Sequence, residues 1–254
     1  MNRTISRTFE ILNYIASQDG VTLKEIINAV SMPKSSAFDI VHSLLALNLI
    51  ETNQYNDKKY ELGIKTFALG QKYSQKRTFI EICAKHMMPL ADELERTAFV
   101  GVRSGADVVY VYKYMGIGAK LATCNVGTSH PTYTTALGKA LLAYLDQDTL
   151  KEVLGSIDYI EKTSNTIKNK DVLEKNLKDT KKRGFSIDNK ENEEMIICYG
   201  APIFDASHQL IAAISFSDVK NPVLSDDEIG SKIRECALRI SRELGYSGKV
   251  FWEE

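Results

Sequence analysis

The residues best suited to contact nucleic acid follow Pro33. A proline fits the first turn of a helix, where its missing N–H is not needed. The helix predicted behind it presents short hydrogen-bond donors, a cation and aromatic rings on one face: Lys34, Ser35, Ser36, Phe38, Asp39 and His42. Such groups at a helix N-terminus can bond to base edges and phosphates in a major groove. An ordinary three-helix packing unit is the alternative interpretation.

Four more residues could contact DNA phosphates: Arg7, Thr22, Lys58 and Lys59. The last two fall on a predicted hairpin and the others at helix ends. Residues 1–77 hold 10 Lys and Arg against 7 Asp and Glu, a net charge of +3, whereas the whole chain carries −1. A mildly basic first part joined to an acidic remainder is consistent with a DNA-binding module fused to a sensor.

The segment 127–140 holds the densest group of special residues. Gly138-Lys139 resembles part of a phosphate loop, but Tyr133 and Ala140 stand where that motif needs Gly and Ser or Thr. A polar loop that opens a helix near Thr135 could still hold a small anion. A plain capped helix explains the same residues equally well.

Polar residues on three predicted strands could face a ligand: Asp188, Cys198, Ser215 and Ser217. Ser215 and Ser217 share a face because side chains alternate along a strand. Inward polar groups need partners, which either a small polar ligand or neighbouring backbone could supply.

Catalysis has little support in the sequence. Cys198 with His130 or His208, or Ser215 with a histidine, could pair a nucleophile with a base, but no Gly-x-Ser-x-Gly or His-Glu-x-x-His motif is present. A metal at Asp188, Cys198 and His130 is equally unsupported, since the three are far apart in sequence. We therefore expect no enzyme activity, no metal and no cofactor.

The elements around Pro33 follow the order of a winged helix-turn-helix. Phe9, Leu12, Ile15 and Ala16 predict a first helix, and Thr22-Leu23-Lys24-Glu25 forms a capping box for a second. The third helix has an apolar stripe, and residues 51–62 read as two strands around the polar tip Asn53–Asp57. A helix with a possible bend in 71–78 and an amphipathic helix over 79–94, with Pro89 inside it, come next.

Beyond residue 98 strands alternate with helices, which predicts an α+β sheet domain. The strands are expected at 100–103, 108–114, 120–124, 185–188, 196–203 and 210–216. The helices are expected at 135–145, 149–154, 171–183 and 226–244, the last behind the capping box Ser225–Glu228. The 4 cysteines lack a Cys-x-x-Cys pair, which is typical of reduced thiols in the cytoplasm, and no apolar run is long enough for a membrane span.

Ordered motifs across the whole chain resemble the IclR (isocitrate lyase regulator) family of bacterial transcription factors. Near the N-terminus they are Arg7–Leu12, Met32-Pro33-Lys34-Ser35-Ser36 and Tyr60-Glu61-Leu62-Gly63. Further on they are Thr135–Ala143, Arg183-Gly184-Phe185, Asp188–Glu191, Cys198–Ile203 and Ala213–Ser217.

The resemblance implies a winged helix-turn-helix over 1–63, a linker helix over 64–77 and a GAF-like antiparallel-sheet effector domain over 78–254. It implies a homodimer, which can pair with another dimer to form a tetramer. It also implies that the partners are a double-stranded DNA operator and a small organic acid as effector. The effector residues carried over by position are Ala119, Ala136, Leu137, Asp188, Ile196, Cys198, Ser215 and Ser217.

Three positions depart from the family pattern. Asp39 replaces an arginine of the third helix, so DNA contacts are redistributed or Asp39 pairs with Arg7 or Lys34. Lys190 replaces a glutamate and adds a cation near the expected pocket, and Met195 replaces a glycine and could narrow its mouth. The sequence predicts a regulator whose operator affinity depends on a bound acid; the alternative is a sensor or enzyme whose N-terminal helices serve only oligomerisation.

Overall fold

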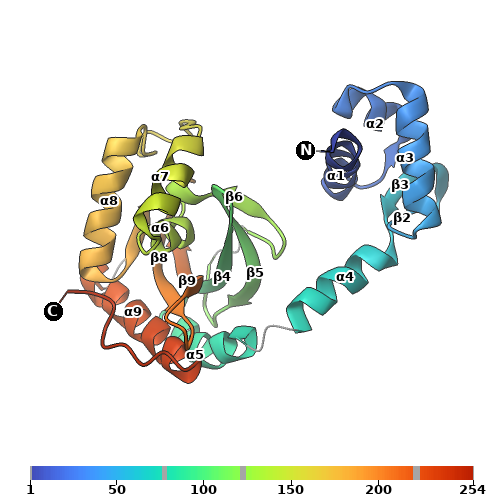
Figure 1. Ribbon diagram of the computed structural model, residues 1–254. Helices are drawn as coiled ribbons and strands as arrows, with labels where there is room; N and C mark the ends of the chain where they lie inside the picture. The colour runs from blue at the N-terminus through green and yellow to red at the C-terminus, as the bar shows by residue number, and fades with distance from the viewer. Residues whose placement is uncertain (1, 76–78, 121–123, 220–223, 254) are drawn as a thin grey trace. The chain divides into compact units, whose positions relative to one another are not determined.

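The computed structural model describes residues 2–75, 79–120, 124–219 and 224–253. The chain divides into two compact units, residues 1–77 and 78–254 (Figure 1). The smaller unit contains α1 (Arg3–Ala16), β1 (Val21–Thr22), α2 (Leu23–Val30), α3 (Lys34–Ala46), β2 (Ile50–Asn53), β3 (Asn56–Leu62) and α4 (Ile64–Gln75). Its antiparallel sheet has the order β1-β3-β2. The predicted winged helix-turn-helix is therefore confirmed.

Local signals set the tight turn before α3. The capping box of Thr22 and Glu25 begins α2, and Ser31 ends it with φ of +48°, a left-handed conformation that reverses the chain direction. Pro33 directly precedes α3 as its N-cap residue. Ala37, Val41 and Leu44 are buried on the inner face of α3, as the periodicity predicted.

The apolar stripe predicted for α1 was partly wrong. Ile11 and Ile15 are buried, whereas Phe9 is 62% exposed and Ala16 is also exposed. Leu12 is half-buried and packs against the core that holds Ile11 and Ile15, so the buried face of the helix is centred on these residues and leaves Phe9 outside it. The bend expected in 71–78 is not seen up to Gln75, where α4 is still helical; residues 76–78 lie outside the described residues.

The larger unit is built on one antiparallel sheet of order β6-β5-β4-β9-β8-β7. Its strands are β4 (Thr97–Ser104), β5 (Asp107–Met115), β6 (Ser129–Pro131), β7 (Ser186–Asn189), β8 (Ile196–Phe204) and β9 (Leu210–Val219). Its helices are α5 (Phe79–Glu93), the 3₁₀ turn η1 (Thr132–Thr134), α6 (Ala136–Leu142), α7 (Gln147–Ser156), α8 (Lys170–Arg183) and α9 (Asp226–Glu243). The α+β prediction is confirmed. Residues 121–123 of the strand predicted at 120–124 lie outside the described residues.

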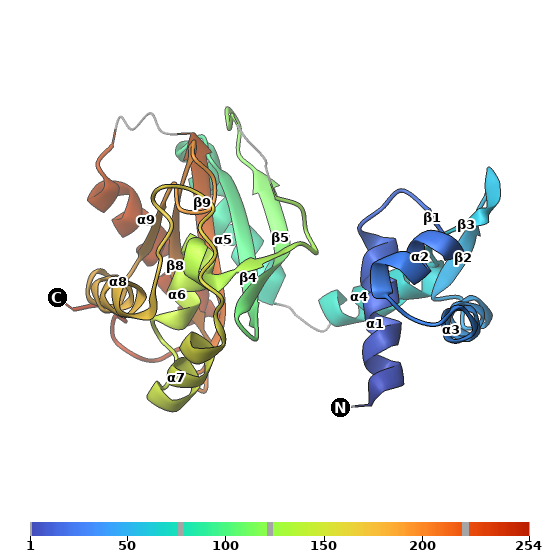
Figure 2. The same ribbon diagram turned by 90° about the horizontal axis from the view of Figure 1, so that it is seen from above.

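Helices cover both faces of this sheet (Figure 2). Residues such as Val100 and Ile214 face α5 and α9 in the main core, and α5 remains helical through Pro89. The residues next to these, such as Phe99 and Ala213, point to the opposite face of the sheet and pack against Leu137 of α6. Among the described residues, no helix is both long and apolar enough to cross a membrane.

Candidate functional site

A small cavity lined by both polar and apolar side chains lies on the face of the sheet that α6 covers. Its volume is about 20 Å³, room for about one water molecule. Its walls come from β4, β5, β7, β8 and β9, the segment between β5 and β6, the N-cap of α6 and the loop after β7. The lining residues are Phe99, Tyr110, Cys124, Thr135, Asp188, Asn192, Glu193, Ile196, Cys198 and Ser217. Four of these, Asp188, Ile196, Cys198 and Ser217, are among the predicted effector residues.

Strand register explains how distant residues meet at the cavity. Asp188 on β7 pairs with Cys198 on β8, which pairs with Ser217 on β9. Directly opposed residues of antiparallel strands point to the same face, and the Cys198 Sγ lies 3.0 Å from the Ser217 Oγ. Phe99 on β4, opposite Ser215, and Tyr110 on β5 add two aromatic rings beside this row, with ring centroids 5.3 Å apart.

The other predicted effector residues lie outside the cavity lining. Ala136 and Leu137 are buried in the first turn of α6, where the Ala136 carbonyl accepts a hydrogen bond from Ser186. Ser215 is buried on β9 opposite Phe99 and Gly200. Ala119 lies in the turn after β5, and Met195 is 68% exposed and is not among the lining residues.

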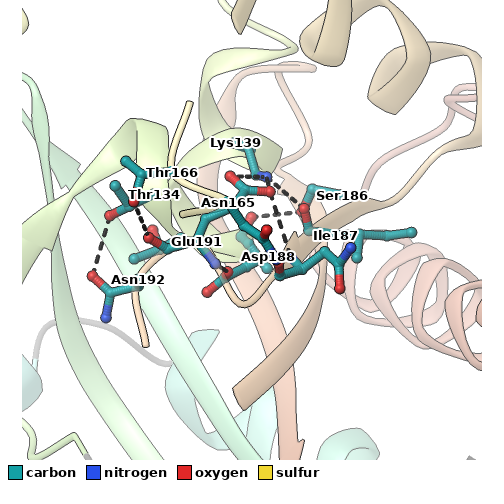
Figure 3. Close-up of polar contacts among 12 residues, drawn as sticks. Thr134, Lys139, Asn165, Thr166, Ser186, Ile187, Asp188, Glu191 and Asn192 are labelled. Carbon is teal, nitrogen blue, oxygen red and sulfur yellow. Dashed lines mark hydrogen bonds and ion pairs between the residues drawn. The ribbon is translucent and has the colours of Figure 1, made fainter. Parts of the chain in front are cut away.

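A buried ion pair fixes the loop beside the cavity. Lys139 is fully buried, and its Nζ donates to both Glu191 carboxylate oxygens at 2.6 and 2.7 Å and also to the Ile187 carbonyl (Figure 3). The preceding Gly138 permits this packing, since a Cβ there would lie 2.2 Å from the Thr132 backbone. Gly138-Lys139 therefore serves close packing and loop anchoring rather than phosphate binding.

A second set of contacts holds the same loop from outside. The Thr163 hydroxyl donates to the Lys190 carbonyl at 2.7 Å, and the Thr166 hydroxyl donates to the Glu191 carbonyl at 2.7 Å. The Asn165 amide donates to the Asn189 carbonyl at 3.0 Å. Residues 163–166, which we call the strap, thus fasten residues 189–191 (Figure 3). Sequence patterns did not reveal this contact, because the two segments are far apart in the chain.

Asp188 is a carboxyl group whose pKa the fold raises strongly. It is 3% exposed, and its Oδ1 accepts a hydrogen bond from the Glu191 backbone N–H at 2.7 Å. Burial raises its pKa to about 7, although Lys139 and backbone N–H groups act in the opposite direction. The carboxyl at the cavity wall is therefore partly protonated near neutral pH.

We expect this carboxyl to make stability depend on pH. The folded protein keeps a proton that the unfolded chain releases at its ordinary pKa of 3.8, so the stabilisation present below 3.8 is lost as the pH rises to about 7. The free energy of unfolding of the wild type should therefore fall as the pH rises from 5 to 8. Asp188→Asn should make this fall about 2–3 kcal/mol smaller. Urea unfolding at both pH values measures it. Asp205→Asn changes a carboxyl at an exposed turn, and its free energy of unfolding should fall with pH as that of the wild type does. An equal fall in the Asp188→Asn and Asp205→Asn variants would contradict the assignment to Asp188.

The catalytic and metal alternatives receive no geometric support. Cys198 contacts Ser217, and burial holds the pKa of its thiol well above the usual range. His130 lies 3.6 Å from the Cys124 sulfur, and His208 contacts Ser247. The structure describes all four cysteines, and none forms a disulfide. The described residues contain no cluster of His, Cys, Asp and Glu suited to a metal ion.

The second candidate surface is the outer face of α3. The six predicted residues, Lys34, Ser35, Ser36, Phe38, Asp39 and His42, are all exposed. The rings of Phe38 and His42 contact each other at a tilt, with centroids 3.8 Å apart. Pro33 provides no side-chain cap to the helix, so the N–H groups of the first turn remain available to a phosphate.

The remaining predicted DNA contacts differ in availability. Arg7 donates to Glu10 at 2.8 Å and to the Val30 carbonyl at 2.6 Å, so its guanidinium already holds the end of α2. The Thr22 hydroxyl belongs to the capping box. Lys58 and Lys59 are consecutive on β3, so they point to opposite faces of the wing. Asp39 forms no ion pair with Arg7 or Lys34 among the described residues.

Comparisons with known proteins agree with this architecture. Residues 4–54 match the family model of the IclR helix-turn-helix domain, and residues 71–242 match that of the bacterial transcriptional regulator IclR C-terminal domain. The HTH-type transcriptional regulator KdgR of Escherichia coli is 27% identical over 98% of this chain and 95% of its own.

Solved structures show the same likeness. The Thermotoga maritima IclR is 30% identical, with a TM-score of 0.71 over 97% of this chain and all of its own. An IclR homolog from Microbacterium hydrocarbonoxydans, complexed with 4-hydroxybenzoate, shares the fold with a TM-score of 0.80 at 20% identity, over 95% of this chain and 98% of its own. The relatives are named as regulators, which confirms the prediction of a regulator rather than an enzyme. The chain belongs to the IclR family and is a DNA-binding transcriptional regulator.

Proposed function

We propose that a small organic acid binds in the cavity of the larger unit and thereby changes the affinity of the smaller unit for its operator. The observation that carries this proposal is the row of hydrogen-bonding side chains, Asp188, Cys198 and Ser217, that three strands bring to one cavity. The 4-hydroxybenzoate bound by the Microbacterium homolog supports an aromatic or aliphatic carboxylic acid as the ligand class.

Ligand entry requires the cavity to enlarge, because about 20 Å³ is far too small for an organic acid. Asn192 and Glu193 belong to both the lining and the loop after β7, so movement of this loop opens the cavity. The other face of the same sheet packs against α5, the first helix after the DNA-binding unit. An effector that binds the open state better shifts the population of the whole unit, with couplings of about 1–3 kcal/mol typical.

For the operator, we propose that the first turn of α3 enters the major groove. Lys34, Ser35 and Ser36 would contact base edges or phosphates there, and Lys58 would lie near the backbone. Exposed apolar side chains of the smaller unit support a homodimer: Ile5 and Phe9 on α1 and Ile64 and Phe67 on α4. A two-fold dimer reads two half-sites about one helical turn apart.

A binding titration tests the proposal. The full chain is mixed with DNA from upstream of its own gene, at several salt concentrations, with and without 4-hydroxybenzoate, benzoate, propanoate and succinate. We expect a salt-sensitive complex whose affinity changes with at least one acid. Failure to form any such complex would favour the sensor whose N-terminal helices serve only oligomerisation; a complex that no acid alters would overturn the effector part.

A variant that fills the cavity should lose its response to the acid and still bind the operator. Ser217→Leu places a branched side chain in a cavity with room for about one water molecule. We expect at least a tenfold loss of acid response with operator affinity unchanged without acid, measured by fluorescence anisotropy. The matched control Ser104→Leu, exposed at the end of β4, should respond normally. Equal loss of operator affinity and acid response in Ser217→Leu would instead indicate misfolding.

A further inference from the structure

The cavity that we propose for an organic acid has an unexpected charge. Two carboxyl groups, Asp188 and Glu193, line it, and none of the described lining residues is a lysine, arginine or histidine. A carboxylate that enters would therefore meet groups of its own sign. Like charges at close range in a site of low dielectric favour a shared proton over two ionised carboxylates.

The nearest buried cation does not resolve this conflict. All three donors of the Lys139 ammonium are directed at Glu191 and the Ile187 carbonyl. A lysine has three N–H donors and no more, so a ligand could use Lys139 only by breaking its pair with Glu191. On the loop side, the Lys162 ammonium donates to the Asn192 amide oxygen at 2.7 Å.

Apart from Glu193, the other carboxyl of the cavity lining, the groups around Asp188 are neutral or already paired. On β8 and β5 it faces Cys198 and Tyr110, and burial raises the pKa of both well above the usual range. From α6 it faces Lys139 and from its own loop Glu191, which neutralise each other. Cys124 lies on the opposite wall, and burial lowers the pKa of its neighbour His130. Asp188 is thus the lining carboxyl set to exchange a proton near neutral pH.

We infer, on the basis of the proposed function, that an organic acid binds this cavity together with one proton, which Asp188 carries and donates to the ligand carboxylate. The two carboxyl groups then titrate as one pair. Where the free site is already protonated, binding takes up no further proton and affinity is independent of pH. At higher pH, where most molecules carry an ionised Asp188, only the fraction with a protonated Asp188 can bind the acid. The dissociation constant therefore rises about tenfold per pH unit.

Calorimetry of the full chain between pH 5.5 and 8.5 tests the inference. The probes are 4-hydroxybenzoate, benzoate, propanoate and succinate, with 4-hydroxybenzamide and benzamide as neutral matches. We expect an acid that binds at pH 5.5 to lose affinity about tenfold per pH unit above the Asp188 transition, and the amides to bind with no pH dependence. Buffers of different ionisation enthalpy should report uptake of one proton at high pH.

Three variants identify the group that holds the proton. Asp188→Asn keeps a neutral donor at the same place and should make acid binding independent of pH. Glu193→Gln changes the other lining carboxyl, and Asp205→Asn changes a carboxyl at an exposed turn; both should retain the wild-type slope. A slope lost in Glu193→Gln but kept in Asp188→Asn would overturn the assignment to Asp188.

The remaining outcomes separate this inference from the proposed function. Acids that bind equally well at pH 5.5 and 8.5 would overturn the proton linkage and leave the effector proposal standing. Acids that fail to bind at any pH would overturn the effector proposal, and the linkage with it. Wild-type binding alone decides both questions, so neither depends on whether a variant folds.

Discussion

Replacing Lys139 by methionine is expected to lower the free energy of unfolding by about 3–5 kcal/mol. Within the part of the chain that the structure describes, the substitution removes the one cation that contacts the Glu191 carboxylate. Glu191 is only 6% exposed. A buried charge without a partner loses its hydration and gains nothing in return. Urea unfolding followed by circular dichroism should show a lower transition midpoint with little change in slope.

Two controls give this prediction its specificity. Lys168→Met breaks the ion pair of Lys168 with Glu161, two side chains that are 57% and 54% exposed. It should lower the free energy of unfolding by only about 0–1 kcal/mol. The double variant Lys139→Met with Glu191→Leu removes both charges and should recover most of the loss. If Lys139→Met were no more destabilising than Lys168→Met, Glu191 would not be a buried carboxylate that depends on this lysine.

Replacing Lys34 and Ser35 together by alanine should weaken operator binding about 100-fold or more, because each lost base or phosphate contact of this kind is worth about 1–3 kcal/mol. Both residues are exposed in the first turn of α3. The loss of one lysine–phosphate contact should also reduce the slope of log affinity against log salt by about one. Fluorescence anisotropy with the operator and with unrelated DNA measures affinity and selectivity.

Lys151→Ala serves as the matched control, because it removes an exposed lysine of α7 in the larger unit. It should bind the operator as the wild type does. Unchanged affinity and selectivity in the Lys34→Ala, Ser35→Ala double variant would show that another surface contacts the DNA.

The elements that the sequence predicted best carry their own signals. Thr22 with Glu25 and Ser225 with Glu228 form capping boxes within single turns, so the starts of α2 and α9 could be placed from local chemistry. The exposed face of α3 also follows from helical spacing alone. In α1 the predicted stripe contains both Ile15 and Phe9, and only packing against the rest of the unit decides that Ile15 is buried and Phe9 is not.

The cavity could be predicted only in part. Strand alternation and the family resemblance pointed to Asp188, Cys198 and Ser217, which the register does bring together. Phe99 and Tyr110 lie on the hairpin of β4 and β5, whose place at the cavity depends on the pairing of β4 with β9, a strand far away in the sequence. The pair of Lys139 and Glu191 spans 52 residues, and its formation depends on the whole domain having folded. Non-local contacts of this kind leave no signature in a single sequence.

The strap of residues 163–166 has a consequence for how the regulator could be tuned during evolution. Its four hydrogen bonds to residues 189–191 hold in place the loop beside the proposed effector cavity. If the proposed effector binds only when this loop opens, weakening one of these bonds would raise the fraction of molecules with an open cavity, and the effector concentration for a half-maximal response would fall in proportion. Substitution of Thr163 or Thr166 during evolution would thus change the effector concentration at which the target genes respond. The residues that contact the effector and the DNA would stay the same.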